Sequence, residues 1–129
     1  MPIASSLLPR ALMAGAVSLA LVLPAAAHHG WTGNVEDVTS MTGTVVQGVS
    51  LAGPHGSMKI RVDGKVWDIT LAPPARTSRA GLTADAIPVG ATVTVRGNKN
   101  SDPNKREMRA LSVTHGDRTF QAYAEHEQE

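Results

Sequence analysis

Two adjacent histidines, His28 and His29, directly follow Ala25-Ala26-Ala27, a small-residue segment of the kind that signal peptidase cleaves. Cleavage after Ala27 would make His28 the first residue of the mature chain. A terminal histidine combines an α-amine with an imidazole, and this pair of nitrogens can chelate Cu(II), which prefers nitrogen ligands in tetragonal arrangements. The residue types at this junction therefore predict a copper site at the mature N-terminus.

A copper site of this kind needs a further imidazole. The candidates are His29 and His55, and His55 stands in the turn Gly53–Gly56. Imidazole is neutral over much of the physiological pH range, so both side chains could act as ligands. The alternative is that the two N-terminal histidines only begin a polar arm and bind nothing specifically. A fourth histidine, His115, is expected on the rim of the fold at the end of a strand.

Residues 1–27 have the pattern of an export signal. Arg10 supplies a positive charge, and an apolar run of 13 residues extends from Ala11 to Leu23. A helix of that length is too short to span a hydrocarbon core of about 30 Å. We therefore expect residues 1–27 to be a cleaved signal peptide, the protein to be periplasmic, and no membrane segment to remain after cleavage.

The composition of the chain after cleavage limits the possible classes of function. Removing residues 1–27 would leave 102 of 129 residues, with 11 basic and 11 acidic side chains, since Arg10 is the charged residue lost. This balance argues against nucleic acid as a partner, because nucleic-acid binders usually carry a basic face. The four aromatic residues are also few for stacking bases. The absence of cysteine excludes thiol catalysis, thiolate metal sites and disulfides.

The sequence gives little support to an enzyme. It has no Gly-x-Ser-x-Gly elbow, phosphate-binding loop or His-Glu-x-x-His helix. Its aspartates are scattered, and hydrolysis by paired carboxylates would need two of them within about 10 Å. Most fall in expected turns or on outward faces: Asp63, Asp68, Asp85, Asp102 and Asp117. We expect a binding protein without catalytic residues, and copper is the one cofactor that the residues suggest.

The clearest structural signal is a β-hairpin. Apolar residues alternate with polar ones over Met58–Asp63 and again over Lys65–Leu71. The dipeptide Asp63-Gly64 between them favours a two-residue type I′ turn. That turn pairs Val62 with Lys65 and places Trp67 on the same face as Ile60.

Further strands are expected at Met41–Val49, Ala91–Gly97 and Glu107–His115, with short helical turns within residues 75–86 and a short edge strand at 119–123. Residues 28–40 are predicted to form an arm, 41–123 the barrel domain and 124–129 an acidic tail. Three strands, a helical connection and two strands are the order of an OB-fold, a five-stranded partly open barrel. A small β-sandwich is the alternative.

Inward positions of these strands predict the core. Its members are Val45, Ile60, Val62, Trp67, Ile69, Val93, Val95, Leu111 and Val113. Emptying the Trp67 site by Trp67→Ala is expected to cost roughly 3–5 kcal/mol if the ring is fully buried. Gly43 and Gly48 mark positions for a bulge or a sharp bend in the first strand.

A second class of function is an interaction module of the cell envelope. In an OB-fold the ligand face is framed by the loops after the first and fourth strands. These correspond to Ser50–Gly56 and Asn98–Lys105, and the second loop carries Lys99 and Lys105 with Arg106 beside it. Such a module would bind a small anion, a peptide or an envelope protein, with the histidine arm incidental.

Several short motifs resemble a family of small, uncharacterised, exported bacterial proteins. They are His28-His29 after an Ala-x-Ala segment, the strand Thr42–Val45, Pro54-His55, Trp67, and the run Pro88–Val95 followed by a polar loop. The similarity covers most of residues 28–120. This chain has Gly53 where members usually have Asn before Pro-His, and Thr70 where they have an acidic residue. The resemblance implies export and a β-barrel, and the family has no established activity to carry over.

Overall fold

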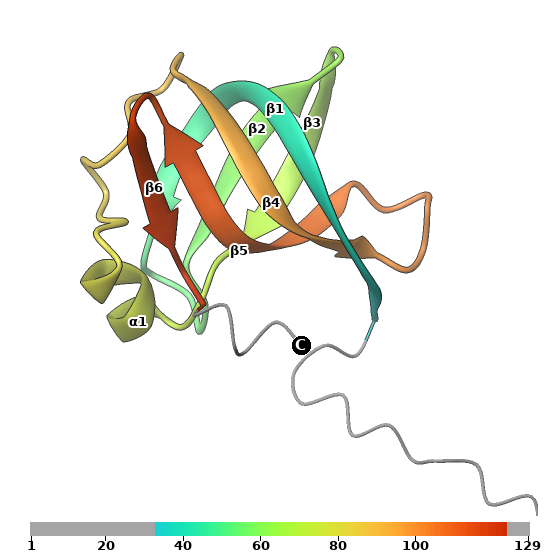
Figure 1. Cartoon of the computed structure of the whole chain (residues 1–129), viewed down its shortest axis with the longest axis horizontal. Coiled ribbons are helices and arrows are strands. Elements are labelled where there is room, and N and C mark those ends of the chain that lie inside the picture. The colour runs from blue at the N-terminus through green and yellow to red at the C-terminus, as the bar shows by residue number, and fades with distance from the viewer. Residues whose placement is uncertain (1–32, 124–129) are drawn as a thin grey trace, which may run out of the picture.

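The computed structural model describes residues 33–123, which form six strands and one short helix. The elements in chain order are β1 (Asn34–Ser50), β2 (Ser57–Val62), β3 (Lys65–Thr70), α1 (Pro74–Arg79), β4 (Thr92–Asn100), β5 (Glu107–His115) and β6 (Arg118–Gln121). The helix lies at one end of the barrel (Figure 1). Within residues 33–123, no helix is long and apolar enough to cross a membrane. The predicted signal peptide, His28, His29 and the acidic tail lie outside the described residues.

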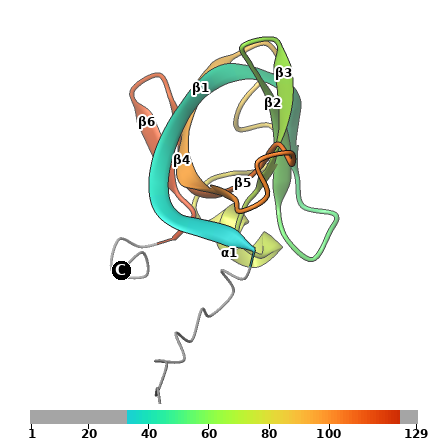
Figure 2. The same cartoon turned by 90° about the vertical axis from the view of Figure 1, so that its right-hand side faces the viewer.

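Five of the strands close into a ring. The sheet order is β3-β2-β1-β4-β5-β6, and an additional parallel pairing of β3 with β5 joins the two sides. Figure 2 looks through this ring of strands and shows β1 curving round a single interior. This is the strand order of an OB-fold, so the predicted OB-fold-like five-stranded barrel is confirmed over the β-sandwich. The sixth strand, β6, pairs with the edge of β5 that faces away from β4.

Strand β1 serves both halves of the barrel. Its first part pairs with β4 as far as Thr44, and its second part pairs with β2 from the same residue onward. A strand that changes neighbours must coil strongly, and Gly43 stands where it does so. A Cβ at Gly43 would lie 2.5 Å from the carbonyl oxygen of Arg61 on β2. Gly43 is therefore needed for a close backbone approach, and the irregular pairing of β1 with β2 lies further on, between Val45 and Ser50.

The predicted arm at 28–40 is wrong for residues 34–40, which form the first part of β1. Their partners are in β4, with Asn34 opposite Asn100 and Ser40 opposite Arg96. A register shift separates Asn34 from Val38. The side-chain amide of Asn98 donates to the carbonyls of Val35 and Glu36 there, at 3.1 Å each. These hydrogen bonds hold a sequence with little strand character in an extended conformation.

The hairpin of β2 and β3 is confirmed in turn and register. Asp63 and Gly64 have φ of 49° and 76°, the positive values that a type I′ turn requires at both central residues. Val62 pairs with Lys65, and Ile60 with Trp67. The helix and β5 also match their predicted positions.

The barrel interior is apolar, and seven of the nine predicted core residues are buried. Val62 and Trp67 are only partly buried at its edge. Leu111 is buried but in a different place from the prediction, because it packs with Ala72, Ala122 and Tyr123 outside the main core. The cause is a bulge: Arg96 pairs with Ser112, whereas its neighbour in β4 pairs with Ala110, so Leu111 is extra and faces the other way.

Gly97 is the β4 residue at that bulge, and its substitution tests the close approach of the two strands. A Cβ there would overlap the carbonyl oxygen of Arg109, whereas a Cβ at Gly48 would meet nothing closer than 3.8 Å. Gly97→Ala is expected to lower the free energy of unfolding by about 2–3 kcal/mol or more, the upper range for overpacking. Gly48→Ala should leave it unchanged or raise it by up to about 1 kcal/mol. Urea denaturation followed by circular dichroism measures both; a loss below about 1 kcal/mol for Gly97→Ala would contradict this packing.

Candidate functional site

Strands β3 and β5, which close the barrel, pair over only part of their length. Parallel pairing of β3 with β5 joins Asp68 to Glu107, Ile69 to Met108 and Thr70 to Arg109. Trp67 points inward one residue before this ladder begins, so no residue of β5 pairs with it. Its ring is therefore partly buried, which corrects its predicted place in the closed core.

Trp67 instead lines a hollow of about 350 Å³, which we call the Trp67 hollow. The ammonium of Lys99 lies 5.4 Å from the centroid of the indole ring, a cation–π contact. The other lining residues come from the start of β1, the end of β4 and the loop that follows: Val35, Asn100, Ser101, Pro103 and Lys105. The hollow thus combines one aromatic ring with two lysines, and the ammonium of Lys99 lies against the ring.

The loop between β4 and β5 is held by its own polar side chains. The carboxylate of Asp102 accepts a hydrogen bond from the N–H of Asn104 at 2.9 Å, and the side chain of Asn100 accepts one from the N–H of Asp102 at 2.8 Å. Ser101 donates from its N–H and its hydroxyl to the carbonyl of Gly33, at 2.8 and 2.9 Å. These local bonds fix the loop in one shape beside β1.

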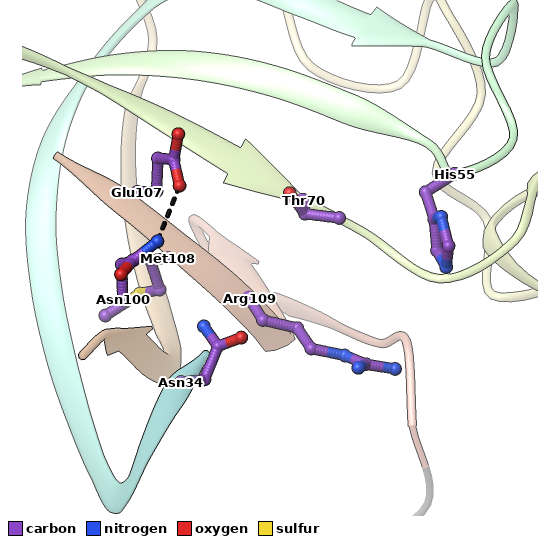
Figure 3. Close-up of a pocket in the computed structure, with 7 residues that line it drawn as sticks. All are labelled: Asn34, His55, Thr70, Asn100, Glu107, Met108 and Arg109. Atoms are coloured by element: carbon purple, nitrogen blue, oxygen red, sulfur yellow. Dashed lines mark hydrogen bonds between the residues drawn. The ribbon is translucent and has the colours of Figure 1, made fainter. Parts of the chain in front are cut away.

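A second hollow of about 250 Å³, the His55 hollow, lies at the same end of the barrel. Its lining joins the loop after β1 to the ends of four strands: Asn34, His55, Thr70, Asn100, Glu107, Met108 and Arg109 (Figure 3). Asn100 lines both hollows and donates from its amide to the carboxylate of Glu107 at 2.7 Å.

His55 is exposed, and the residue after it fixes the loop that carries it. The N–H of Gly56 donates to Ala72 at 2.9 Å, and the carbonyl of Gly56 accepts from Leu71 at 2.7 Å. A Cβ at Gly56 would lie 3.0 Å from the side chain of Thr77, so the loop packs against α1. The backbone that carries His55 is therefore anchored on its C-terminal side by the hydrogen bonds of Gly56.

Arg109 enters the His55 hollow with its orientation set by a tyrosine. Its guanidinium donates to the hydroxyl of Tyr123 at 2.7 Å and lies 5.0 Å from the centroid of the same ring. Arg76 of α1 lies 5.3 Å from that ring. Tyr123 is buried, so it is a rigid support for both cations.

Only one of the three predicted copper ligands lies within the described residues. His55 lines a hollow, whereas His28 and His29 lie outside the described residues. His115 ends β5, six residues beyond Arg109 and so about 20 Å further along the strand. It is partly buried, as expected for the rim, and does not meet His55. Residues 33–123 contain no group of three or more His, Asp or Glu side chains that could hold a metal ion.

The two predicted binding loops do meet at one end of the barrel. His55 represents the first loop, and Asn100, Ser101, Pro103 and Lys105 the second. Asn34, Thr70, Glu107 and Arg109 were not predicted. The one available signal was Arg109, a charged residue in an otherwise small and apolar stretch from Met108 to Val113.

Comparisons with known proteins give a family and a fold. A model described as "Family of unknown function (DUF6152)" matches residues 16–109. None of the curated proteins matches. Among solved structures, a ZRD-deleted mutant of TiaS in complex with agmatine aligns with a TM-score of 0.51 and 10% identity, over 66% of this chain and 26% of TiaS. At that identity the likeness shows the fold alone.

Two further alignments have a TM-score of 0.47. One is a complex of TiaS with tRNA and ATP, at 13% identity over 60% of this chain and 18% of that chain. The other is the S. pombe Stn1-ten1 complex, at 16% identity over 63% and 59%. The chain spans about a quarter or less of the TiaS chains.

Replacement of Trp67 tests whether the junction of β3 and β5 is open beside the indole ring. Because the ring is partly buried, Trp67→Ala is expected to cost roughly 2 kcal/mol, less than the 3–5 kcal/mol of a fully buried tryptophan. Ile69→Ala is the matched control, since Ile69 is the next inward residue of β3, is 1% exposed and should cost about 2–5 kcal/mol. Urea denaturation gives both values. A loss for Trp67→Ala clearly larger than for Ile69→Ala would place Trp67 in the closed core.

Proposed function

The chain belongs to DUF6152, a family of unknown function whose membership assigns no activity, and we propose a function from the two hollows at the end of the barrel. The protein is an exported, periplasmic binding module without catalytic function. It holds a polar, acidic ligand in the hollows beside the two loops, and a peptide is the favoured ligand.

One observation carries this proposal. The Trp67 hollow and the His55 hollow share Asn100 and lie side by side where the two loops meet. Ligand sites are usually concave, with a few polar groups that fix orientation, and volumes of about 300–1,000 Å³ are typical. Two adjoining hollows of about 350 and 250 Å³ suit one extended ligand better than a compact one.

The charges of the Trp67 hollow favour an anion. Lys99 and Lys105 line it, and no described lining residue of this hollow is acidic. The loop hydrogen bonds reduce the ordering cost of binding, because the loop already has one shape. A single aromatic platform is too few for a strand of bases, each of which stacks on its own ring, so we do not propose nucleic acid.

The non-enzymatic part of the proposal rests on the carboxylates at the site. Glu107 is the one acidic residue among the described lining of the two hollows, and it accepts a hydrogen bond from Asn100. Acid–base catalysis by paired carboxylates needs a second carboxyl group across the ligand. Apart from Glu107 and His55, the polar side chains of the lining are amides, hydroxyls and cations, which are better suited to holding a ligand than to transferring its protons.

A blocked acidic peptide tests this function. We expect N-acetylated, C-terminally amidated tetraglutamate to bind saturably and to shift backbone NMR signals of residues 53–56 and 99–105. Lys99→Gln with Lys105→Gln should weaken binding by about tenfold, because two charge-assisted contacts are lost. Lys65→Gln, an exposed lysine in the β2–β3 turn, is the control and should change nothing. No saturable binding, or shifts confined to another face, would refute the proposal.

Copper at the mature N-terminus is a second candidate, favoured by the position of Asn34. Asn34 lines the same hollow as His55 and follows His28 by six residues, which can span at most about 20 Å. The α-amine and imidazole of His28 are therefore within reach of His55. Closing such a site would cost about 1–2 kcal/mol for each backbone residue that is fixed.

Cu(II) titration separates a specific site from scattered imidazole binding. Three proteins are compared: one whose mass shows that it begins at His28, one with an extra N-terminal Gly-Ser, and His55→Ala. If copper is chelated by the terminal amine, the extension should weaken binding at least tenfold and His55→Ala several-fold. Equal affinity in all three would remove this candidate and leave the peptide-binding proposal unaffected.

A further inference from the structure

The His55 hollow differs from the Trp67 hollow in being polarised. The side chains of Glu107 and Asn100 lie on one side, and those of Arg109 and His55 extend toward the other, with Thr70 between them (Figure 3). A ligand that fits both sides has an anionic group next to a hydrogen-bond donor. A sulfate or a fully ionised phosphate fits poorly, because it offers the Glu107 carboxylate only acceptor oxygens and no donor.

Arg109 is prepared for a carboxylate. A guanidinium is planar, carries five N–H donors and matches the two oxygens of a carboxylate. The bond to the hydroxyl of Tyr123 at 2.7 Å sets the plane of the group. Arg76 adds a second positive charge against the same ring. Holding both cations by one buried ring favours an anion nearby.

We propose that the His55 hollow binds the C-terminal end of a peptide. The terminal carboxylate lies between Arg109 and His55, and the N–H of the last peptide bond points toward Glu107. This inference rests on the proposed function and names the end of the ligand that is recognised. The volume of about 250 Å³ equals about eight water molecules, enough for one or two small residues.

The shared residue gives the direction of the chain. Asn100 lines both hollows, so the residues preceding the C-terminus extend from the His55 hollow into the Trp67 hollow. There, Lys99 and Lys105 favour an acidic side chain, and the indole of Trp67 offers a flat apolar surface. The preferred ligand therefore ends in one or two small residues preceded by an acidic one.

The test compares Ala-Ala-Ala as the free acid with its C-terminal amide, using NMR titration of the full chain. The acid should bind with signals shifted at His55, Thr70 and Asn100, and the amide at least tenfold more weakly. His55→Gln, on an exposed loop, and Arg109→Lys should each reduce the preference for the acid severalfold. Arg61→Gln, an exposed arginine on β2, is the charge control and should leave it unchanged.

Tyr123 is tested as a positioning residue. Tyr123→Phe keeps the ring and removes the hydroxyl that accepts from Arg109, so the acid-to-amide ratio should fall while the midpoint of urea unfolding stays near that of the unchanged protein. A purely structural role would lower stability without changing that ratio. A ratio that Tyr123→Phe leaves unchanged would overturn the assigned role of the Arg109–Tyr123 pair.

Other outcomes would overturn the proposed ligand. Equal affinity for acid and amide excludes C-terminal recognition. So does a lack of binding of the acid, up to about 10 mM, both to the unchanged chain and to the chain without its C-terminal glutamates. Binding of blocked tetraglutamate would still support the broader function. The carboxylates of Glu125, Glu127 and Glu129 are a second source of the same chemistry. If the acid binds only after all three are changed to Gln, the chain's own glutamates occupy the site and an external peptide is rejected.

Discussion

Three residue pairs join β3 to β5, and this short parallel ladder is the contact that makes the sheet a barrel. The N–H of Asp68 also donates to the carbonyl of Arg106, at 2.9 Å, where the ladder begins. Without it, the apolar inner faces of β3 and β5 would each border water, and both strands would present an open edge. The ladder also determines where closure stops. Trp67 stands just beyond it, and the opening beside the ring is the Trp67 hollow.

A second feature of β5 determines the other hollow. The bulge at Leu111 turns this side chain out of the barrel, and its carbonyl accepts from the N–H groups of Ala122 and Tyr123, at 2.8 and 3.2 Å. The residues after β6 therefore continue alongside β5. Tyr123 then reaches Arg109, two residues before the bulge, and orients its guanidinium. An irregularity in strand pairing is thus responsible for the position of a polar side chain at the candidate site.

The sequence predicted best what depends on near neighbours. Asp63-Gly64 specified a turn and a register because both act within a few residues. The first part of β1 was missed because its partners in β4 lie about sixty residues away, and the residues from Asn34 have no strand pattern of their own. The bulge at Leu111 was missed for a similar reason, since a uniform alternation through β5 was the simplest assumption.

Prediction of the site shows the same limit. Both loops were expected from the order of the strands, and they do meet. Asn34, Glu107 and Arg109 come together only through barrel closure, which spacing along the chain does not reveal. Trp67 was correctly predicted to face inward, but its partial exposure depends on the length of the β3–β5 ladder. His55 is the one predicted copper ligand within the described residues, so copper stays a prediction.

The carbonyl of Gly33 accepts two hydrogen bonds from Ser101, so the start of β1 and the loop after β4 are mechanically joined. Separating the loop from the start of β1 would break both bonds, and a typical hydrogen bond in a protein contributes about 0.5–1.5 kcal/mol net. The amide of Ser101 is therefore protected from hydrogen exchange only while the start of β1 stays in place beside the loop.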